Sequence, residues 1–187
     1  SGKSTISDSV INSFSEKGIT FIHVWLRFSH YTAKVVNLIG RITGRSYYEN
    51  YSWGKVGYHN YNGIIGFLYI ISVYLDHILF QTFFKKKNLK LDSRYLIDRY
   101  IIDIVADLIV DTNKIKLIFF LFGPFLKNEL KKTNAYILKC DKKIVISRRP
   151  DIYDDKSYDK KIIAYDKIAS KFNITQLNTG KMSIDMI

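Results

Sequence analysis

Short apolar segments alternate with longer amphipathic ones along most of the chain, and this alternation constrains the fold more than any other feature. The short segments are rich in β-branched and aromatic residues, which is typical of buried strands. The longer ones repeat apolar residues every three to four positions, which is typical of helices packed on one face. A parallel sheet covered by helices on both faces buries such a pattern, so we predict an α/β fold. The expected strands are 19–26, 95–98, 135–140 and 173–178; the expected helices are 3–17, 35–42, 64–84, 99–111, 124–132, 142–149 and 162–172, with 115–122 either strand or helix.

The chain opens on Ser1-Gly2-Lys3-Ser4-Thr5, the second half of the phosphate-binding pattern G-x-x-x-x-G-K-[ST]. In such a loop the backbone N–H groups point at phosphate oxygens, the lysine reaches the β and γ phosphates, and the hydroxyl binds Mg²⁺. The helix expected from Lys3 adds the positive end of its dipole. We therefore expect these five residues to bind the phosphates of a nucleotide.

The first half of that pattern, and the strand that would lead into it, have no counterpart in the sequence. Because a parallel sheet would lose a central member without that strand, we expect residues upstream of Ser1 to belong to the natural protein. For the same reason, an activity test on the chain as it stands is expected to fail.

Asp98 and Arg99 follow the expected strand 95–98 and form the second candidate feature. A carboxylate at the tip of a buried strand can hold Mg²⁺ directly or through water, and a neighbouring guanidinium can neutralise phosphate charge. The alternative is structural, because aspartate is also a favoured N-cap for a helix that begins at Arg99. With Gly2-Lys3-Ser4 upstream, the pattern favours the phosphate-binding interpretation.

Arg148 and Arg149 form the third feature, between the expected helix 142–149 and the acidic loop 151–158. Two guanidiniums on a mobile segment can balance the charge of a transferring phosphoryl group. The alternative is a basic helix C-terminus that complements the helix dipole. We expect segment 147–158 to act as a lid, with one of the two arginines in a structural role.

Composition limits the partners and the location. A formal net charge of +12 favours anionic partners such as nucleotides, although abundant Lys, Ile, Tyr and Asn are also what an A/T-rich genome encodes. Cys140 is the only cysteine, which excludes an intrachain disulfide and a cysteine metal cluster. A reducing cytoplasm is the expected location, since no signal-peptide pattern occurs at the N-terminus. The length of 187 residues fits a single domain.

Two stretches fit the alternation poorly. Segment 64–84 is apolar enough to suggest a membrane span, but Asp76 interrupts it, and an acidic group deep in a bilayer is costly. We therefore expect a long, mostly buried helix.

Segment 44–63 is rich in Gly, Asn and aromatic residues without a steady period, and is expected to be a loop or insertion. Its rings could stack on bases or anchor the loop on the core.

The order of these motifs resembles thymidylate kinase and its nucleotide kinase relatives. Ser1-Gly2-Lys3-Ser4-Thr5 is followed by Ile97-Asp98-Arg99-Tyr100, then by a strand leading to Arg148-Arg149, and last by a long helix and a short strand. The resemblance implies a P-loop three-layer sandwich and transfer of the ATP γ-phosphoryl group to a nucleoside monophosphate with Mg²⁺. In that reaction Lys3 would hold the phosphates, Ser4 and Asp98 would serve Mg²⁺, Arg99 would grip the acceptor phosphate, and Arg148 or Arg149 would come from the lid.

The positions expected around the acceptor depart from the family pattern. Arg27 is followed by Phe28-Ser29-His30 instead of a proline–glycine turn, and Asp76 is followed by His77 where the family has an arginine near the base. Asp76 and His77 could recognise a different acceptor, or they could form a buried hydrogen-bonded pair. The candidate substrate-binding residues are Arg27, Asp76, His77, Arg99, Tyr100 and Asp103.

Two functions therefore stay open. The first is an ATP- and Mg²⁺-dependent kinase whose partner is a nucleotide substrate. The second is a non-catalytic protein of the same fold that binds a nucleotide or nucleic acid through a basic, aromatic surface. Nucleic acid is the weaker expectation, a homodimer is left open, and no membrane partner is expected.

Overall fold

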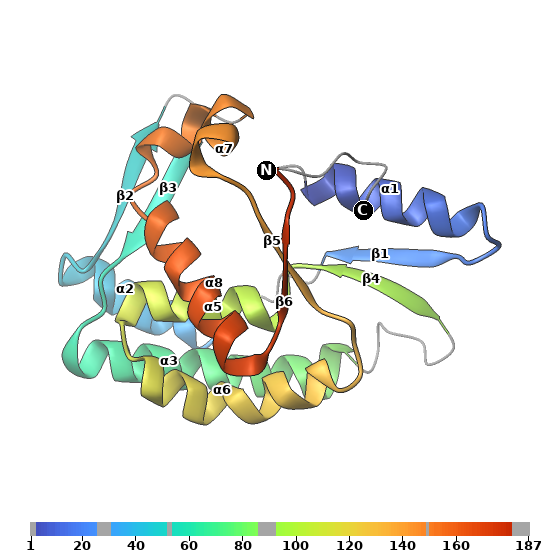
Figure 1. The fold of residues 1–187 in the computed structure, drawn as a ribbon. Helices are drawn as coiled ribbons and strands as arrows, with labels where there is room; N and C mark the ends of the chain where they lie inside the picture. The colour runs from blue at the N-terminus through green and yellow to red at the C-terminus, as the bar shows by residue number, and fades with distance from the viewer. Residues whose placement is uncertain (1–2, 26–30, 52–53, 86–92, 149, 181–187) are drawn as a thin grey trace.

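A computed structural model describes residues 3–25, 31–51, 54–85, 93–148 and 150–180, and the protein is α/β (Figure 1). Its α-helices are α1 (Lys3–Ser15), α2 (Ala33–Ile42), α3 (Gly63–Leu79), α5 (Ile101–Thr112), α6 (Ile115–Leu130), α7 (Lys142–Arg148) and α8 (Tyr158–Phe172). A π-helical segment, Phe80–Lys85, continues α3, and a 3-10 turn, Pro150–Asp154, follows α7. The strands are β1 (Phe21–Trp25), β2 (Ser46–Tyr51), β3 (Gly54–His59), β4 (Arg94–Asp98), β5 (Tyr136–Lys139) and β6 (Thr175–Asn178).

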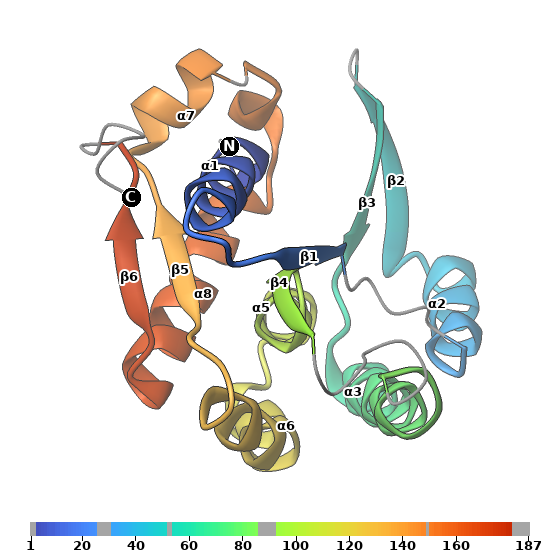
Figure 2. The same cartoon turned by 90° about the vertical axis from the view of Figure 1, so that its right-hand side faces the viewer.

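The described strands form three two-stranded sheets instead of one. β1 pairs parallel with β4, so that Trp25 lies opposite Asp98. β5 pairs parallel with β6, so that Tyr136 lies opposite Thr175. In Figure 2 the β1·β4 pair lies between β5·β6 on one side and the β2·β3 hairpin on the other. The α/β class and the parallel pairing agree with the prediction, but the expected single sheet does not form among the described residues.

The β2·β3 pair is an antiparallel hairpin, which corrects the expectation of a loop or insertion over 44–63. Tyr47 lies opposite Tyr58, and Tyr48 lies opposite Gly57. Tyrosines occur on both faces of this ribbon, so the alternation of polar and apolar residues that identifies a strand is hidden. Gly57 is suited to its place, since a Cβ there would lie 3.2 Å from the ring of Tyr48.

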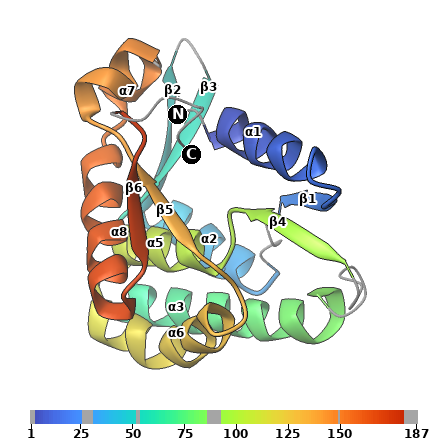
Figure 3. The ribbon, with the colours of Figure 1, turned by 45° about the vertical axis from the view of Figure 1, so that its right-hand side comes forward.

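The core lies among α3, α5, α6 and α8, and α2 packs on α3 (Figure 2). By contrast, α1 has no buried side chain over residues 5–15. It lies along β1 (Figure 3), where the rings of Phe14 and Phe21 meet edge to face at 5.2 Å between centroids. The apolar side chains with no exposed surface are Ala33, Tyr61, Ile70, Val105, Ala106, Ile118, Phe122, Leu126, Ala164 and Ile168.

Tyr61 connects three helices. Its backbone N–H donates to the carbonyl oxygen of Asp111 at 2.8 Å, and its hydroxyl donates to Asn37 Oδ1 at 2.9 Å. A Cβ at Gly40 would lie 2.5 Å from the Tyr61 ring, and one at Gly66 would lie 2.2 Å from the Tyr61 carbonyl oxygen. Both glycines are therefore required by the close approach of Tyr61 to α2 and α3.

The structure of α6 shows that 115–122 is helical and corrects the expected start of a helix at Pro124. Residues 115–130 form one helix, so Pro124 lies inside it and does not begin a new one. Proline has no N–H for the carbonyl group four residues earlier. The exposed side chain at that position, Phe120, shows that this side of α6 faces water, which can donate the hydrogen bond that the Phe120 carbonyl oxygen lacks. Burial of Phe122 and Leu126 on the opposite side holds the two halves together.

α3 is a helix as expected, but it is not mostly buried. Its inner face packs into the core through Tyr69, Ile70 and Val73, whereas the outer face is exposed. In the described part of the chain, the helical stretch 63–83 alone is long and apolar enough to cross a bilayer, and 33% of its most apolar 18-residue stretch is buried. Length and composition do not distinguish the core helix of a globular protein from a membrane-spanning helix. Asp76 and His77, which interrupt the apolar run, both lie on the inner face.

Candidate functional site

Asp98 and Arg99 lie at the carboxyl end of β4, beside the end of β1 (Figure 3). Ligands of α/β proteins bind at this end of parallel strands. α1 begins at Lys3, so the backbone of Lys3 and Ser4 forms a first helical turn, as a phosphate loop requires, and Thr5 is exposed in that turn. Four predicted site residues lie outside the described residues: Ser1, Gly2, Arg27 and Arg149.

Arg99 has a left-handed backbone conformation, with φ at 59°. This conformation costs a residue with a Cβ about 1–2 kcal/mol, and such strain concentrates at functional sites. Its side chain is exposed at the strand end, while that of Asp98 is half-buried. The N-cap of α5 is Tyr100. Asp98 is therefore not the N-cap of this helix, which corrects the capping role weighed from the sequence.

Arg99, Asp103 and Tyr165 form a polar cluster behind the tip of β4. The Tyr165 hydroxyl on α8 donates to Asp103 Oδ1 at 2.6 Å. Burial raises the pKa of the Tyr165 phenol, Asp103 raises it further, and the positive charge of Arg99 opposes them. Tyr165 is therefore held neutral as a donor. Asp103 lies in the first turn of α5, where the helix dipole favours a carboxylate.

Gln81 links His77 and Tyr100, and it was not predicted from the sequence as a site residue. Gln81 Nε2 lies 3.3 Å from His77 Nε2 and donates to the Tyr100 hydroxyl. Burial raises the pKa of Tyr100, and Glu129 adds to the shift while the hydrogen bond from Gln81 opposes it. His77 has no exposed surface, so a ligand outside the protein would meet Tyr100 before His77.

Asp76 is engaged by the protein itself. Its carboxylate accepts hydrogen bonds from the backbone N–H groups of Tyr31 at 2.9 Å, Thr32 at 2.8 Å and Ala33 at 3.1 Å. It also accepts one from the Thr32 hydroxyl at 2.9 Å. The first N–H groups of a helix have no partner within the helix, so a carboxylate from α3 caps α2. This contact accounts for a buried aspartate without any ligand, and His77 is not its hydrogen-bond partner in these contacts.

Arg148 lies exposed in the last turn of α7, at the same end of the molecule as the start of α1 (Figures 1 and 2). The segment that follows is attached to the hairpin, because Lys156 Nζ lies 2.5 Å from Glu49 Oε1. Hydrogen bonds from Lys156 and then from the Tyr51 hydroxyl lower the pKa of Glu49. The structure thus gives the predicted lid segment a partner on β2.

The described residues contain no group of three or more His, Cys, Asp or Glu side chains placed to hold a metal ion. Nucleotide-bound Mg²⁺ needs fewer protein ligands, since it keeps several waters and takes oxygens from the phosphates. A single carboxylate at a strand tip, such as that of Asp98, fits this donor set.

Tyr165 and Gln81 were missed by the sequence argument, although each carries a signal. A tyrosine on the apolar face of helix 162–172 brings a hydroxyl that must find a partner when buried. Gln81 lies four residues after His77, one turn along the same helix. Local spacing could therefore have suggested Gln81, while the partner of Tyr165 lies 62 residues away in the sequence.

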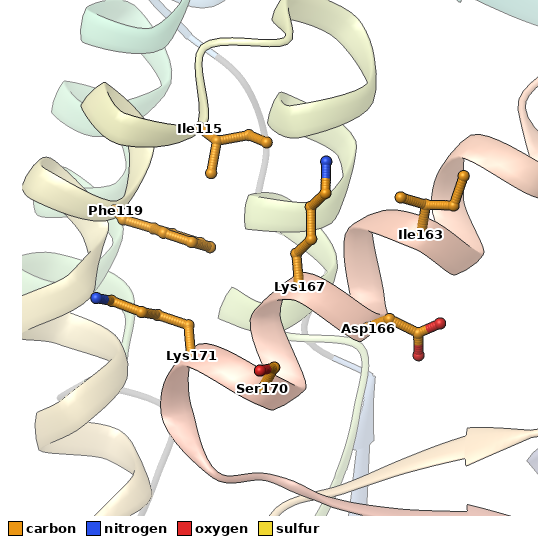
Figure 4. Close-up of a pocket in the computed structure, with 7 residues that line it drawn as sticks. All are labelled: Ile115, Phe119, Ile163, Asp166, Lys167, Ser170 and Lys171. Atoms are coloured by element: carbon orange, nitrogen blue, oxygen red, sulfur yellow. The ribbon is translucent and has the colours of Figure 1, made fainter.

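A shallow groove of about 630 Å³ lies between α6 and α8 (Figure 4). Phe119 lines its α6 wall, and Lys167 and Lys171 lie along its α8 wall. It shares no residue with the tip of β4, where Asp98, Arg99 and Tyr100 follow one another. The chain matches no family model, no curated protein and no solved structure.

Proposed function

We propose that the protein is an ATP- and Mg²⁺-dependent phosphotransferase that acts on a nucleoside monophosphate, on a P-loop fold of the thymidylate kinase type. The observation that carries this proposal is the pair Asp98-Arg99 at the carboxyl end of β4. Arg99 keeps a strained conformation there, and Asp98 does not cap the helix that follows. A strained, exposed guanidinium beside a carboxylate is suited to a phosphate with its metal ion.

The roles follow from position. Lys3 and Ser4, at the start of α1, hold the ATP phosphates and Mg²⁺, and Asp98 holds the same ion directly or through water. Arg99 binds the acceptor phosphate, and Asp103, which accepts the hydrogen bond of the Tyr165 hydroxyl, lies on the helix that follows. Tyr100 lies against the acceptor. We assign Asp76 to the α2 cap and no longer to the substrate.

The proposed fold unites the two parallel pairs in a single sheet. β4 and β5 would each lie next to one further parallel strand, so that β1, β4, the added strand, β5 and β6 follow one another. α1 would then follow the added strand directly, as a phosphate loop requires. The absence of buried side chains over residues 5–15 of α1 supports this proposal, because such a sheet would give the helix a surface to cover.

The test is a phosphoryl-transfer assay of the full-length protein with γ-labelled ATP, Mg²⁺ and a panel of nucleoside monophosphates. Arg99→Ala, Asp98→Ala and Lys3→Ala are each expected to lower kcat/KM by about 100-fold or more, because each removes a charge that stabilises the transferring group. Arg94→Ala is the matched control, since Arg94 is an exposed arginine at the opposite end of β4.

The control variant is expected to keep full activity. Equal activity of the Arg99 and Arg94 variants would contradict the assigned role of Arg99. Turnover that survives both Lys3→Ala and Asp98→Ala would contradict the whole set of roles. Binding of ATP without turnover of any monophosphate would support the proposed nucleotide-binding site but contradict the proposed kinase activity.

One observation favours the second candidate function, a nucleic-acid-binding protein. Tyr48 on the hairpin lies between two cations, with the guanidinium carbon of Arg41 5.0 Å and Lys55 Nζ 4.6 Å from its ring centroid. Its ring is 45% exposed, as is that of Tyr47. An exposed ring flanked by cations is suited to a base and its phosphate.

Fluorescence anisotropy with a labelled single-stranded oligonucleotide tests this candidate. Binding that weakens steeply with salt, and weakens about tenfold in Tyr48→Ala, is expected if the hairpin stacks on bases. Tyr153→Ala removes another exposed tyrosine, outside the hairpin, and serves as the control. Equal binding by the two variants would contradict a role for the hairpin.

A further inference from the structure

α6 and α8 both pack on α5 and leave between them the groove of about 630 Å³ described above, which we call the α6–α8 groove (Figure 4). Phe119 joins its two sides, because the Phe119 ring on α6 meets that of Phe172 on α8 edge to face, at 5.4 Å between centroids. Ile115 on α6 and Ile163 on α8 extend the apolar lining, and Ile163 keeps 54% of its surface exposed. The groove therefore offers a preformed apolar wall to a partner.

The rim of the α6–α8 groove is positively charged. Lys167 and Lys171 are exposed and lie about one helical turn apart on α8. In Figure 4, Lys171 extends toward Phe119, and Lys167 extends between Ile115 and Ile163. A lysine stem can cover apolar surface while its ammonium group stays in water. Two cationic groups therefore lie beside the apolar lining.

The acidic residue of the groove does not cancel these charges. Asp166 accepts hydrogen bonds from Lys139 Nζ at 2.5 Å and from Gln176 Nε2 at 3.0 Å. The contact with Lys139 lowers the pKa of Asp166, and that with Gln176 adds to the effect. Figure 4 shows Asp166 pointing away from α6. Neither Lys167 nor Lys171 forms an ion pair with another residue in the part of the chain that the structure describes.

We propose that the α6–α8 groove binds an acidic amphipathic helix of a partner protein. Docking of an amphipathic helix in an apolar groove is a recurring mode of recognition. The apolar side of the incoming helix lies against Phe119 and Ile163. Carboxylates along one edge of that helix, spaced three or four residues apart, meet Lys167 and Lys171. The net charge of +12 on the whole chain also draws an acidic partner toward the protein.

Shape and charge favour this partner over other occupants. The groove is shallow and open to solvent, whereas sites for small molecules bury about 70–90% of the ligand surface. A helix covers such a groove from outside. A second copy of the chain, related by a two-fold axis through the groove, would bring Lys167 and Lys171 near their own copies, and like charges repel. A nucleic acid binds through a longer series of cations along its backbone, and the groove lining supplies two lysines.

Fluorescence anisotropy of the full-length protein with a labelled, designed peptide tests the proposal. The peptide is a helix-forming sequence of about 16 residues, with leucines repeating every three to four positions and glutamates beside them. It is expected to bind with a dissociation constant in the micromolar range. A second peptide, in which glutamine replaces every glutamate, is expected to bind about tenfold or more weakly. Equal binding of the two peptides, or no binding at about 100 μM protein, would overturn the proposal.

Charge reversal locates the binding site. Lys167→Glu and Lys171→Glu are each expected to raise the dissociation constant of the acidic peptide by about tenfold or more, because an attractive contact becomes repulsive. Lys160→Glu is the matched control, since Lys160 is an exposed lysine of α8 that does not line the groove. It changes the net charge by the same amount and should change binding by less than about twofold. Equal weakening in all three variants would assign the binding to overall charge and overturn the proposal.

Ile163→Ser tests the apolar wall and is expected to weaken binding of the acidic peptide about fivefold. Ile42→Ser is its control, because Ile42 is exposed to 77% on α2, outside the groove. All the substituted side chains are exposed, so the circular dichroism spectrum should not change. Binding that survives both Ile163→Ser and Lys167→Glu would overturn the proposal. The readout needs neither ATP nor turnover, so the result stands apart from the proposed function.

Discussion

Asp76 and Asp98 look alike in the sequence, since each follows an apolar run and precedes a basic residue, but their surroundings differ. Asp76 is 1% exposed, and four hydrogen bonds from residues 31–33 engage its carboxylate. Asp98 is half-buried at a strand tip, beside an arginine held in a strained conformation. The comparison teaches that a buried, saturated carboxylate stabilises the fold, whereas a carboxylate beside backbone strain is the better candidate for chemistry.

The largest expected effect is on Asp76, and it is an effect on stability. Asp76→Ala leaves the first N–H groups of α2 without their acceptor, one of them at the buried Ala33, which should cost about 3 kcal/mol. Urea denaturation measures this loss. Asp8→Ala, at an exposed position on α1, is the control and should cost less than about 0.5 kcal/mol. If Asp76→Ala kept full stability but changed ligand binding, the contrast with Asp98 would be wrong.

A smaller loss of stability is expected for Tyr165→Phe. Tyr165, like Asp98, belongs to the candidate functional site. Tyr165→Phe removes the hydroxyl that donates to Asp103 at 2.6 Å, and a hydrogen bond to a charged group contributes about 1.5–3 kcal/mol. Under the proposed function, the Michaelis constant for the acceptor should also rise, because Asp103, a candidate substrate-binding residue, would lose its hydrogen-bond donor. Thermal unfolding and steady-state kinetics separate the two effects. Tyr153→Phe, at an exposed tyrosine, should change neither. A stability loss at Tyr165 with an unchanged Michaelis constant would make the cluster structural.

The sequence identifies what is local and misses what is distant. Strands β1 and β4 were predicted because their β-branched and aromatic residues are adjacent, and the placement of Asp98 at a strand tip followed from that. The hairpin was missed because tyrosines on both faces hide its period. The capping role of Asp76 was not predictable in the same way, because its donors lie 43–45 residues earlier and meet it only after α2 packs on α3. The left-handed turn at Arg99 has no signal in residue type, since arginine does not favour it.

Arg99→Gly should sharpen the comparison by separating stability from function. Glycine adopts φ near 59° without the steric cost of a Cβ, so the variant is expected to gain up to about 1 kcal/mol in stability. Activity under the proposed function should fall as far as in Arg99→Ala, which keeps the strain. Asn173→Gly relieves a second left-handed residue, at the C-cap of α8, and should gain stability without losing activity. A loss of stability in Arg99→Gly would mean that the Arg99 side chain stabilises the fold. The strained turn would then be explained by that stabilisation and not by ligand binding.

The smallest expected effect concerns Asp111, a carboxylate that is neither saturated like Asp76 nor placed at a strand tip. Burial raises the pKa of Asp111 well above its usual range, the nearby Asp107 raises it further, and Lys161 opposes them. The folded protein therefore holds this proton more tightly than the unfolded chain does. The stability contributed by the protonated Asp111 carboxyl group is fully present below the pKa of about 3.9 in the unfolded chain. It is lost as the pH rises through the pKa of Asp111 in the folded protein. At neutral pH the unfolded chain gains more from releasing this proton than the folded protein does, so Asp111→Asn, which has no such proton to release, should stabilise the fold by on the order of 1 kcal/mol. The difference in unfolding free energy between the variant and the wild type should grow from pH 4 upward. A difference independent of pH would mean that Asp111 is ionised at no cost, and that its carboxylate, like that of Asp76, is stabilised by its neighbours.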